Sequence, residues 1–478
     1  MASLIKRLNL PWFVALLALI TINIVLSLLT SGSAEYIVND NDRWREFTGE
    51  IIMWFQDADH ALDPGFSNYN HAFTPLYPVM GAILGFPFND AGVGLSITSA
   101  IFTTLSMVVL GLFLKEHYNF DLNKIVKFLA FFMTNYFMII YIAVPTETEQ
   151  AIMFCTIFNL YTLQRHEKDP SIKNKLLLSL SYGLSLYCRE ILWPMLLFPV
   201  IFIMWEILLQ RKENGIFTKE NAIRVIEIFA FSTLVPLGGY LPFVFGANQL
   251  ELITTRFNIL TGYGKSIIEL ITHGLIAFGF TFIIPVFIML DDVSRKLDNK
   301  ETQNKVFFNS DHRMLITWLA FFIGYRLISP GPFWKRYWIP IIFGIFIIDF
   351  MLMDRLLEGR KSKSFATWVM VAANYTFNVI FVMMQILHGA TFETLADDLL
   401  LVAGVFLGTF WLPPVAIFLY DFQYTREDGT SGFGWFIAII ISCWAGLALY
   451  LDRTSKEMNK TKQPQQGSRI SHQVDDGS

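Results

Sequence analysis

The sequence has little charge, little cysteine and no basic excess. Only 16% of its 478 residues are charged, and 36 Lys and Arg stand against 40 Asp and Glu, a net charge of −4. Binding to nucleic acid through phosphate contacts needs a surplus of positive charge, so no nucleic-acid partner is expected. Cys155, Cys188 and Cys443 all lie in apolar stretches. They form neither a disulfide framework nor a metal-binding spacing.

Apolar residues are abundant instead. They make up 54% of the chain, aromatic residues make up 16%, and Phe alone occurs 46 times. The mean hydropathy of +0.47 lies well above that of water-soluble domains. This composition predicts an integral membrane protein whose helix faces contact membrane lipids.

Long apolar runs predict the fold class. A transmembrane helix needs about 20 mostly apolar residues, and counting such runs gives about 11 to 13 spans. We therefore predict an all-α, polytopic transmembrane helical bundle. The first run is too long for a signal-peptide core and has no obvious small-residue cleavage site, so it is expected to remain as a span. The runs lie near residues 11–31, 93–114, 126–144, 150–164, 176–188, 190–210, 222–246, 267–290, 314–328, 337–354, 365–387, 399–420 and 433–451.

The positions of Lys and Arg predict the orientation. Lys6 and Arg7 precede the first span, and alternate loops are rich in positive residues, so the N-terminus is expected to be cytoplasmic. Residues 1–451 are expected to form one transmembrane domain, and 452–478 a polar, disordered tail. An odd number of spans would put the tail outside, whereas its Lys and Arg favour the cytoplasm. The basic loops are 115–127, 165–175, 211–224, 291–313 and 355–363; the loops predicted to face outward are 32–92, 145–149, 247–266, 329–336 and 388–398.

The first outward loop, 32–92, is the longest and holds nine acidic residues against two basic ones. Long ordered loops on a membrane scaffold usually bind ligands or carry chemistry. Within this loop, the segment 43–55 places aromatic and aliphatic residues at helical spacing, which predicts an amphipathic helix in the membrane interface. Asp40 and Asp42 stand just before this segment. One of them could cap the helix, which leaves the other for a different role.

Two further outward elements contain candidate ligand-binding residues. Pro75 and Pro78 would end one helix and start another, which places His71 and Tyr77 near the membrane surface. This element is either a rigid turn alone or a site where His71 donates a hydrogen bond to an anionic or hydroxylated ligand. Glu147 and Glu149 stand at the start of the run near 150–164. The helix dipole accounts for one acid, and two together suggest a hydrogen-bonded polar site at membrane depth.

Basic residues also lie at outward helix ends. Arg189 and Glu190 separate two apolar runs, and Lys335, Arg336 and Tyr337 begin another. Lys335 and Arg336 could anchor the chain at the interface by snorkelling, and Arg189 could form a salt bridge with Glu190 or another acid. Alternatively, cations aimed inward would bind a phosphate whose lipid tail stays in the bilayer.

The order of these motifs resembles a known family. An acidic motif from Asn39 to Trp44 follows the first span, the His-x-x-x-Pro-Leu-Tyr-Pro element (71–78) comes next, and a Pro-x-Glu start (145–147) and an Arg-Tyr-x-x-Pro stretch (336–340) follow. This arrangement is similar to the GT-C superfamily of polytopic glycosyltransferases, especially its dolichyl- or polyprenyl-phosphate-sugar mannosyltransferase-like members. The motifs cover a few dozen residues, and the topology resembles the family over most of the chain.

The resemblance implies an inverting transfer of a hexose, such as mannose, from a lipid-linked sugar donor. The acceptor would be a hydroxyl or amide of a lipid, glycan or protein on the outer face of a prokaryotic plasma membrane or the lumenal face of the endoplasmic reticulum. Asp40 or Asp42 would act as the base or orient the acceptor. The family often has Tyr three or four residues after this acid, and Trp44 takes that place here; we favour Asp40. The sequence sets neither the acceptor nor the oligomeric state.

The expected chemistry needs no cofactor. Arg189, Lys335 or Arg336 would stabilise the departing phosphate, which can replace a general acid. Asp40 and Asp42 could still bind Mg²⁺ or Mn²⁺ through their oxygens. The substrate-binding residues are expected to be His71, Tyr77, Glu147, Glu149, Arg189, Lys335, Arg336 and Tyr337.

A polytopic transporter or lipid flippase is the main alternative. Pro236, Gly238, Gly239 and Pro242 in one run suggest a broken helix of the kind that transporters use. No internal repeat is visible, however, and the acids gather at outer helix ends rather than at mid-membrane. A noncatalytic membrane scaffold is a third possibility, which would leave the first-loop acids without a role.

Overall fold

The computed structural model describes residues 41–57, 74–133, 135, 137–138, 148–209, 218–246, 250–251, 253–254, 312–329 and 335–356. Within these ranges the chain is helical with short turns and contains no strand, which confirms the predicted helical class. Three of its helical segments are long and apolar enough to cross a membrane: Ala91–Tyr118, Glu190–Leu209 and Lys219–Phe245. These agree with the predicted runs near 93–114, 190–210 and 222–246.

The chain divides into two compact units. The first comprises Met1–Gly279, Lys305–Ile348 and Met370–Ala390, and it contains nearly all of the described helices. The second comprises Phe280–Asn304, Asp349–Val369 and Thr391–Ser478. The predicted spans near 11–31, 267–290, 365–387, 399–420 and 433–451 lie outside the described residues.

Helices α3 (Asn41–Gln56) and α4 (Leu76–Gly85) come from the predicted first outward loop. α3 buries Trp44 and Phe47, as the helical spacing of its apolar residues predicts. The helix begins at Asn41, so Asp42 belongs to its first turn rather than preceding it. α4 starts directly after Pro75. Proline suits this place because it has no backbone N–H to lose.

Helix α5 (Ala91–Tyr118) is the longest described helix, and its ends follow from its sequence. The Asp90 side chain caps it by accepting from the backbone N–H of Val93 at 3.1 Å. Asn119 ends it with a left-handed backbone, φ 53°. α4 lies against α5 so closely that a Cβ on Gly94 would stand 2.0 Å from the carbonyl oxygen of Gly81. Glycine is therefore required at this contact.

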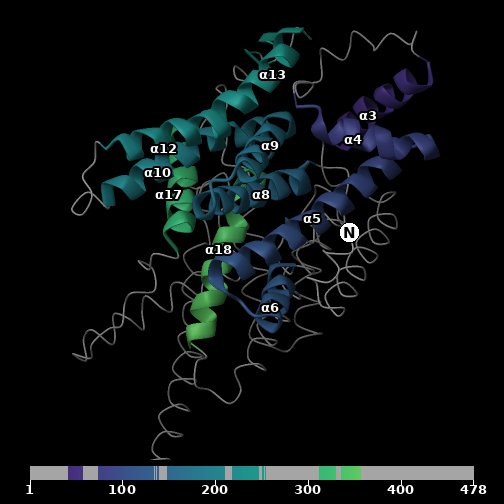
Figure 1. Cartoon of the computed structure of the whole chain (residues 1–478). Coiled ribbons are helices and arrows are strands. Elements are labelled where there is room, and N and C mark those ends of the chain that lie inside the picture. The colour runs from purple at the N-terminus through teal and green to yellow at the C-terminus, as the bar shows by residue number, and fades with distance from the viewer. Residues whose placement is uncertain are drawn as a thin grey trace, which may run out of the picture. The chain divides into compact units, whose positions relative to one another are not determined.

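Helix α8 (Glu149–Lys168) lies between α5 and α9 (Ile172–Cys188), whereas α6 (Leu122–Met133) contacts α5 (Figure 1). The ring of Phe102 on α5 lies 5.5 Å from that of Phe154 on α8. Tyr161, about two turns further along α8, donates a hydrogen bond to Glu116 of α5. These contacts occur in the same order along both helices, so α5 and α8 run parallel.

Two of the apolar segments contain irregular turns. A 3₁₀ segment, η4 (Glu190–Leu197), contains Pro194 and leads into α10 (Phe198–Leu209). A π turn, η5 (Ala230–Leu234), joins α12 (Lys219–Phe229) to α13 (Val235–Gly246). The Thr233 hydroxyl donates to the carbonyl of Leu196 at 2.8 Å, so the two irregular turns meet.

The remaining described helices are α17 (Arg313–Ile328), η8 (Lys335–Trp338) and α18 (Ile339–Leu356). α17 packs against α10, and its Trp318 ring lies 5.0 Å from that of Phe198. The Trp318 indole also donates to the carbonyl of Pro340 at 3.0 Å, which fixes the start of α18 beside α17. The order α3, α4, α5, α8, α9 and α13 follows the chain from neighbour to neighbour in space.

Candidate functional site at the start of α8

The Arg189 guanidinium is the meeting point of several elements. It is 2% exposed and directly follows α9. Its Nη1 donates to the Thr148 hydroxyl at 3.2 Å, its Nε lies 3.5 Å from a carboxylate oxygen of Glu190, and its central carbon lies 5.4 Å from the Trp44 ring. The predicted Arg189–Glu190 pair is therefore present. A buried cation is stable only with such partners.

Tyr77 joins this group through Trp44. The two rings meet edge to face, with centroids 6.2 Å apart and planes at 82°. The Tyr77 hydroxyl lies 2.7 Å from the Ser99 hydroxyl and donates to the carbonyl of Leu95 at 3.3 Å. Tyr77 is fully buried, because α4 presses it onto α5. The Trp44 ring therefore lies between Arg189 and the predicted site residue Tyr77 and contacts both.

The first turn of α8 supplies three buried polar residues: Thr148, Glu149 and Gln150. Thr148 occupies the N-cap position but makes no side-chain bond to its own helix. Its hydroxyl accepts from Arg189 instead. The first N–H groups of a helix have no partner within the helix and carry partial positive charge. The Arg189 guanidinium and the first N–H groups of α8 therefore lie among the buried carboxylates of Glu149 and Glu190, so the region offers both donors and acceptors to a polar ligand.

A second buried arginine lies at the end of α17. Arg326 is 5% exposed, donates through Nη1 to the Ser329 hydroxyl at 3.2 Å and stands 4.7 Å above the Tyr337 ring. This second arginine group therefore joins the end of α17 to η8. We refer to Arg189, Arg326, Glu149, Glu190 and their aromatic partners Trp44 and Tyr337 as the arginine cluster.

Four of the predicted site residues belong to this region: Tyr77, Glu149, Arg189 and Tyr337. The others cannot be placed with them. Asp40, His71 and Glu147 lie outside the described residues, as do the side chains of Asp42, Lys335 and Arg336, whose backbones belong to α3 and η8. Among the described residues no group of three or more His, Cys, Asp or Glu could hold a metal ion. The Mg²⁺ or Mn²⁺ prediction concerned Asp40 and Asp42 and stays a prediction.

Two buried residues of the site were missed by the sequence reasoning. Arg326 carried a usable signal, because it is an ionisable residue inside an apolar run, and such residues usually have a function. Gln150 carried none. In the sequence, Gln150 looks like any polar residue at the start of a helix. Only the structure shows that its side chain is fully buried.

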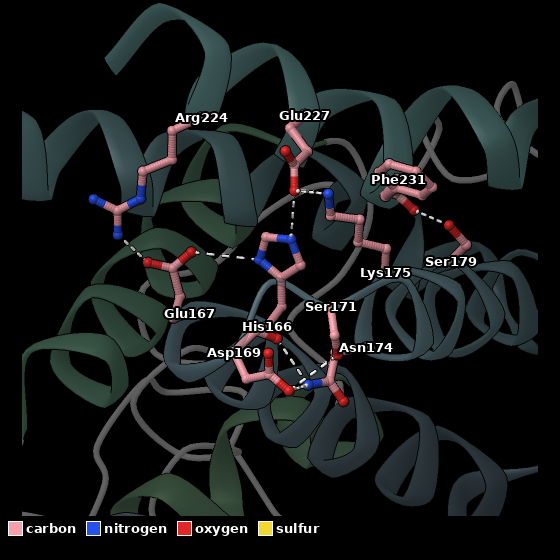
Figure 2. Close-up of polar contacts among 10 residues, drawn as sticks. All are labelled: His166, Glu167, Asp169, Ser171, Asn174, Lys175, Ser179, Arg224, Glu227 and Phe231. Atoms are coloured by element: carbon pink, nitrogen blue, oxygen red, sulfur yellow. Dashed lines mark hydrogen bonds and ion pairs between the residues drawn. The ribbon is translucent and has the colours of Figure 1, made fainter. Parts of the chain in front are cut away.

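A second polar cluster joins α8, α9 and α12 at the other end of α8 (Figure 2). The buried His166 ring lies 3.3 Å from a Glu227 oxygen through Nε2 and 3.6 Å from a Glu167 oxygen through Nδ1. Lys175 pairs with Glu227 at 2.8 Å, and Arg224 pairs with Glu167. This His166 cluster holds three helix ends together. All three ends belong to the loops 165–175 and 211–224, which the charge pattern assigns to one side.

Neither a comparison with protein-family models nor a search of curated proteins gave a match for this chain.

Proposed function

We propose that this protein is a polytopic membrane glycosyltransferase of the GT-C type. It moves a hexose, such as mannose, from a polyprenyl- or dolichyl-phosphate donor to a hydroxyl or amide on the outer or lumenal face, with inversion. Asp40 or Asp42 serves as the base. The arginine cluster holds the phosphate of the donor.

One observation supports this proposal above the others. The buried Arg189 contacts Trp44 of α3, Thr148 at the start of α8, and Glu190. The Tyr77 ring packs against the same Trp44 ring. These residues come from separate segments that the sequence assigns to the same outward side. α3 also begins at Asn41, so its Trp44 end, near Arg189, is the end that carries Asp42. An arginine that can bind a phosphate and an acidic residue on the first loop are the two parts that such a transfer needs.

The proposed step balances as a single displacement. The acceptor oxygen or nitrogen forms a bond to the anomeric carbon while the bond from that carbon to the phosphate oxygen breaks. The carboxylate takes the proton of the acceptor, and the lipid phosphate leaves with the electron pair. Arg189 and Arg326 would stabilise the charge that develops on this phosphate, because preformed cations in a water-poor site act strongly on developing charge.

Substitution of the two first-loop acids tests this function. Asp40→Asn and Asp42→Asn are compared with the wild type, at matched expression, for transfer of radiolabelled hexose from polyprenyl phosphate in membranes. Loss of the catalytic base is expected to lower transfer by at least about 100-fold in one of the two variants. Asp57→Asn is the matched control, because Asp57 is an exposed acid just beyond the far end of α3. Undiminished transfer in both Asp40→Asn and Asp42→Asn would rule out the catalytic assignment.

The transporter alternative also has a supporting observation. The 3₁₀ segment at Glu190–Leu197 and the π turn at Ala230–Leu234 interrupt two of the apolar segments and touch at Leu196. Transporters commonly place substrates beside interrupted helices. This reading predicts movement of a solute across the membrane without formation of a glycosidic bond.

A further inference from the structure

The Gln150 amide is buried without a hydrogen-bond partner. Its side chain has no exposed surface, and neither its oxygen nor its nitrogen is hydrogen-bonded. Gln150 is the second residue of α8 and directly follows Glu149. Thr148, two residues before it, accepts a hydrogen bond from Arg189 through its hydroxyl. The unpaired amide therefore belongs to the same helix start as the arginine cluster.

A buried amide without a partner costs free energy. A buried amide gives up its hydrogen bonds to water, and folded proteins pair nearly all of their buried polar groups. Gln164, on the same helix and 3% exposed, shows the usual outcome, because this residue does have an interaction partner. An unpaired Gln150 at a helix start is what a site built to receive hydrogen-bonding groups would contain.

The helical register places Gln150 on the face of α8 that meets α5. Gln150 precedes Phe154 by one turn of α8, so it lies on the face that meets Phe102 of α5. Ser99 precedes Phe102 by about one turn of α5, and its hydroxyl contacts that of Tyr77. Because α5 and α8 are parallel, Gln150 and Ser99 stand at the same level. An amide, two hydroxyls and the nearby Glu149 form a mixed set of donors and acceptors.

We infer that Gln150 binds the hydroxyl groups of the hexose that is transferred, and so contributes to the choice of sugar. The inference rests on the proposed function. A primary amide offers two donors and one acceptor with two lone pairs, which matches a pair of adjacent sugar hydroxyls. The phosphate of the donor then lies at Arg189, and the sugar extends from it toward Gln150 and Tyr77.

Thermal unfolding of the ligand-free protein tests the first half of this inference. Gln150→Met keeps the length of the side chain and removes both polar groups, so it is expected to raise the Tm of the purified protein by about 2 °C. Gln164→Met is the matched control and is expected to lower the Tm, because it removes a group that has a partner. If Gln150→Met lowers the Tm as much as Gln164→Met, the amide is satisfied inside the protein and the inference is overturned.

Ligand-induced stabilisation tests the second half. Polyprenyl phosphate mannose is expected to raise the Tm of the wild type more than polyprenyl phosphate alone, and in Gln150→Met the two ligands are expected to act equally. A sugar-dependent difference that survives in Gln150→Met, or is absent from the wild type, would contradict the inference. Failure of the proposed function looks different: the sugar-dependent shift would be present, but no labelled hexose would reach an acceptor.

Discussion

Arg189 shows how a single side chain can link separate segments of the chain. Its planar guanidinium carries five N–H donors in a fixed arrangement, and its faces can stack on aromatic rings. In this protein it bonds to Thr148, pairs with Glu190 and stacks near Trp44. A lysine has neither the planar shape nor the reach for all three contacts. The position therefore depends on the shape of arginine as well as on its charge.

Arg189→Lys is expected to fold and to lose about 100-fold in sugar transfer, because one preformed contact to the developing phosphate charge is worth about that much. Transfer of labelled hexose in membranes measures this loss. Arg165→Lys is the matched control: Arg165, at the other end of α8, also lies over an aromatic ring, 5.7 Å from Tyr161, and bonds to its hydroxyl. Arg165→Lys is expected to leave sugar transfer unchanged.

Arg189→Gln separates stability from chemistry. It leaves Glu190 without its cation, and breaking a buried pair in this way costs about 3–5 kcal/mol in the free energy of unfolding. The double variant with Glu190→Gln removes both charges and is expected to recover most of this stability, but not the transfer activity. Thermal unfolding and transfer are measured on the same preparations. Recovery of transfer in the double variant would show that Arg189 is only a structural partner of Glu190.

At the scale of elements, the position of Tyr77 depends on the close packing of α4 on α5. Gly94 allows this approach, and a methyl group there would overlap the backbone of α4 at Gly81 and Gly85. Gly94→Ala is therefore expected to lower the free energy of unfolding by about 3 kcal/mol, the upper part of the range for overpacking. Gly183→Ala, in α9, meets no atom within 4 Å and is expected to stabilise the protein by up to about 1 kcal/mol. Similar thermal stability of the two variants would contradict the packing described for α4 and α5.

The elements were largely predictable from the sequence, and the site was predictable only in part. Apolar runs and helical spacing predicted α5, α17 and the helix at 43–55, because burial of apolar surface depends on patterns that are local in the chain. The start of α4 followed from Pro75. The contact between Arg189 and Trp44 joins residues 145 positions apart, and no local pattern specifies such a contact. The π turn at Ala230–Leu234 is bonded to Leu196 through Thr233. The helix propensities of residues 230–234 do not predict a contact with a residue so distant in the sequence.

At the scale of the whole molecule, polar groups gather at the two ends of α8 and α9. The arginine cluster lies at the start of α8, and the His166 cluster lies at its end, with hydroxyl pairs such as Thr162–Ser181 along the interface between them. The positive-inside rule predicts that the first end faces outward and the second faces the cytoplasm. The polar groups at the start of α8 are buried, whereas Lys175, Arg224 and Glu227 of the His166 cluster are partly exposed.

Reconstitution of the purified protein into proteoliposomes tests the central claim most directly. The vesicles receive polyprenyl phosphate carrying a labelled hexose and a mixture of candidate acceptors, and products are separated and analysed by mass spectrometry. We predict a new glycosidic bond between the labelled hexose and an acceptor, formed by the wild type and reduced at least about 100-fold by Arg189→Lys. Accumulation of a labelled solute inside the vesicles, with no new glycosidic bond, would contradict the account and favour a transporter.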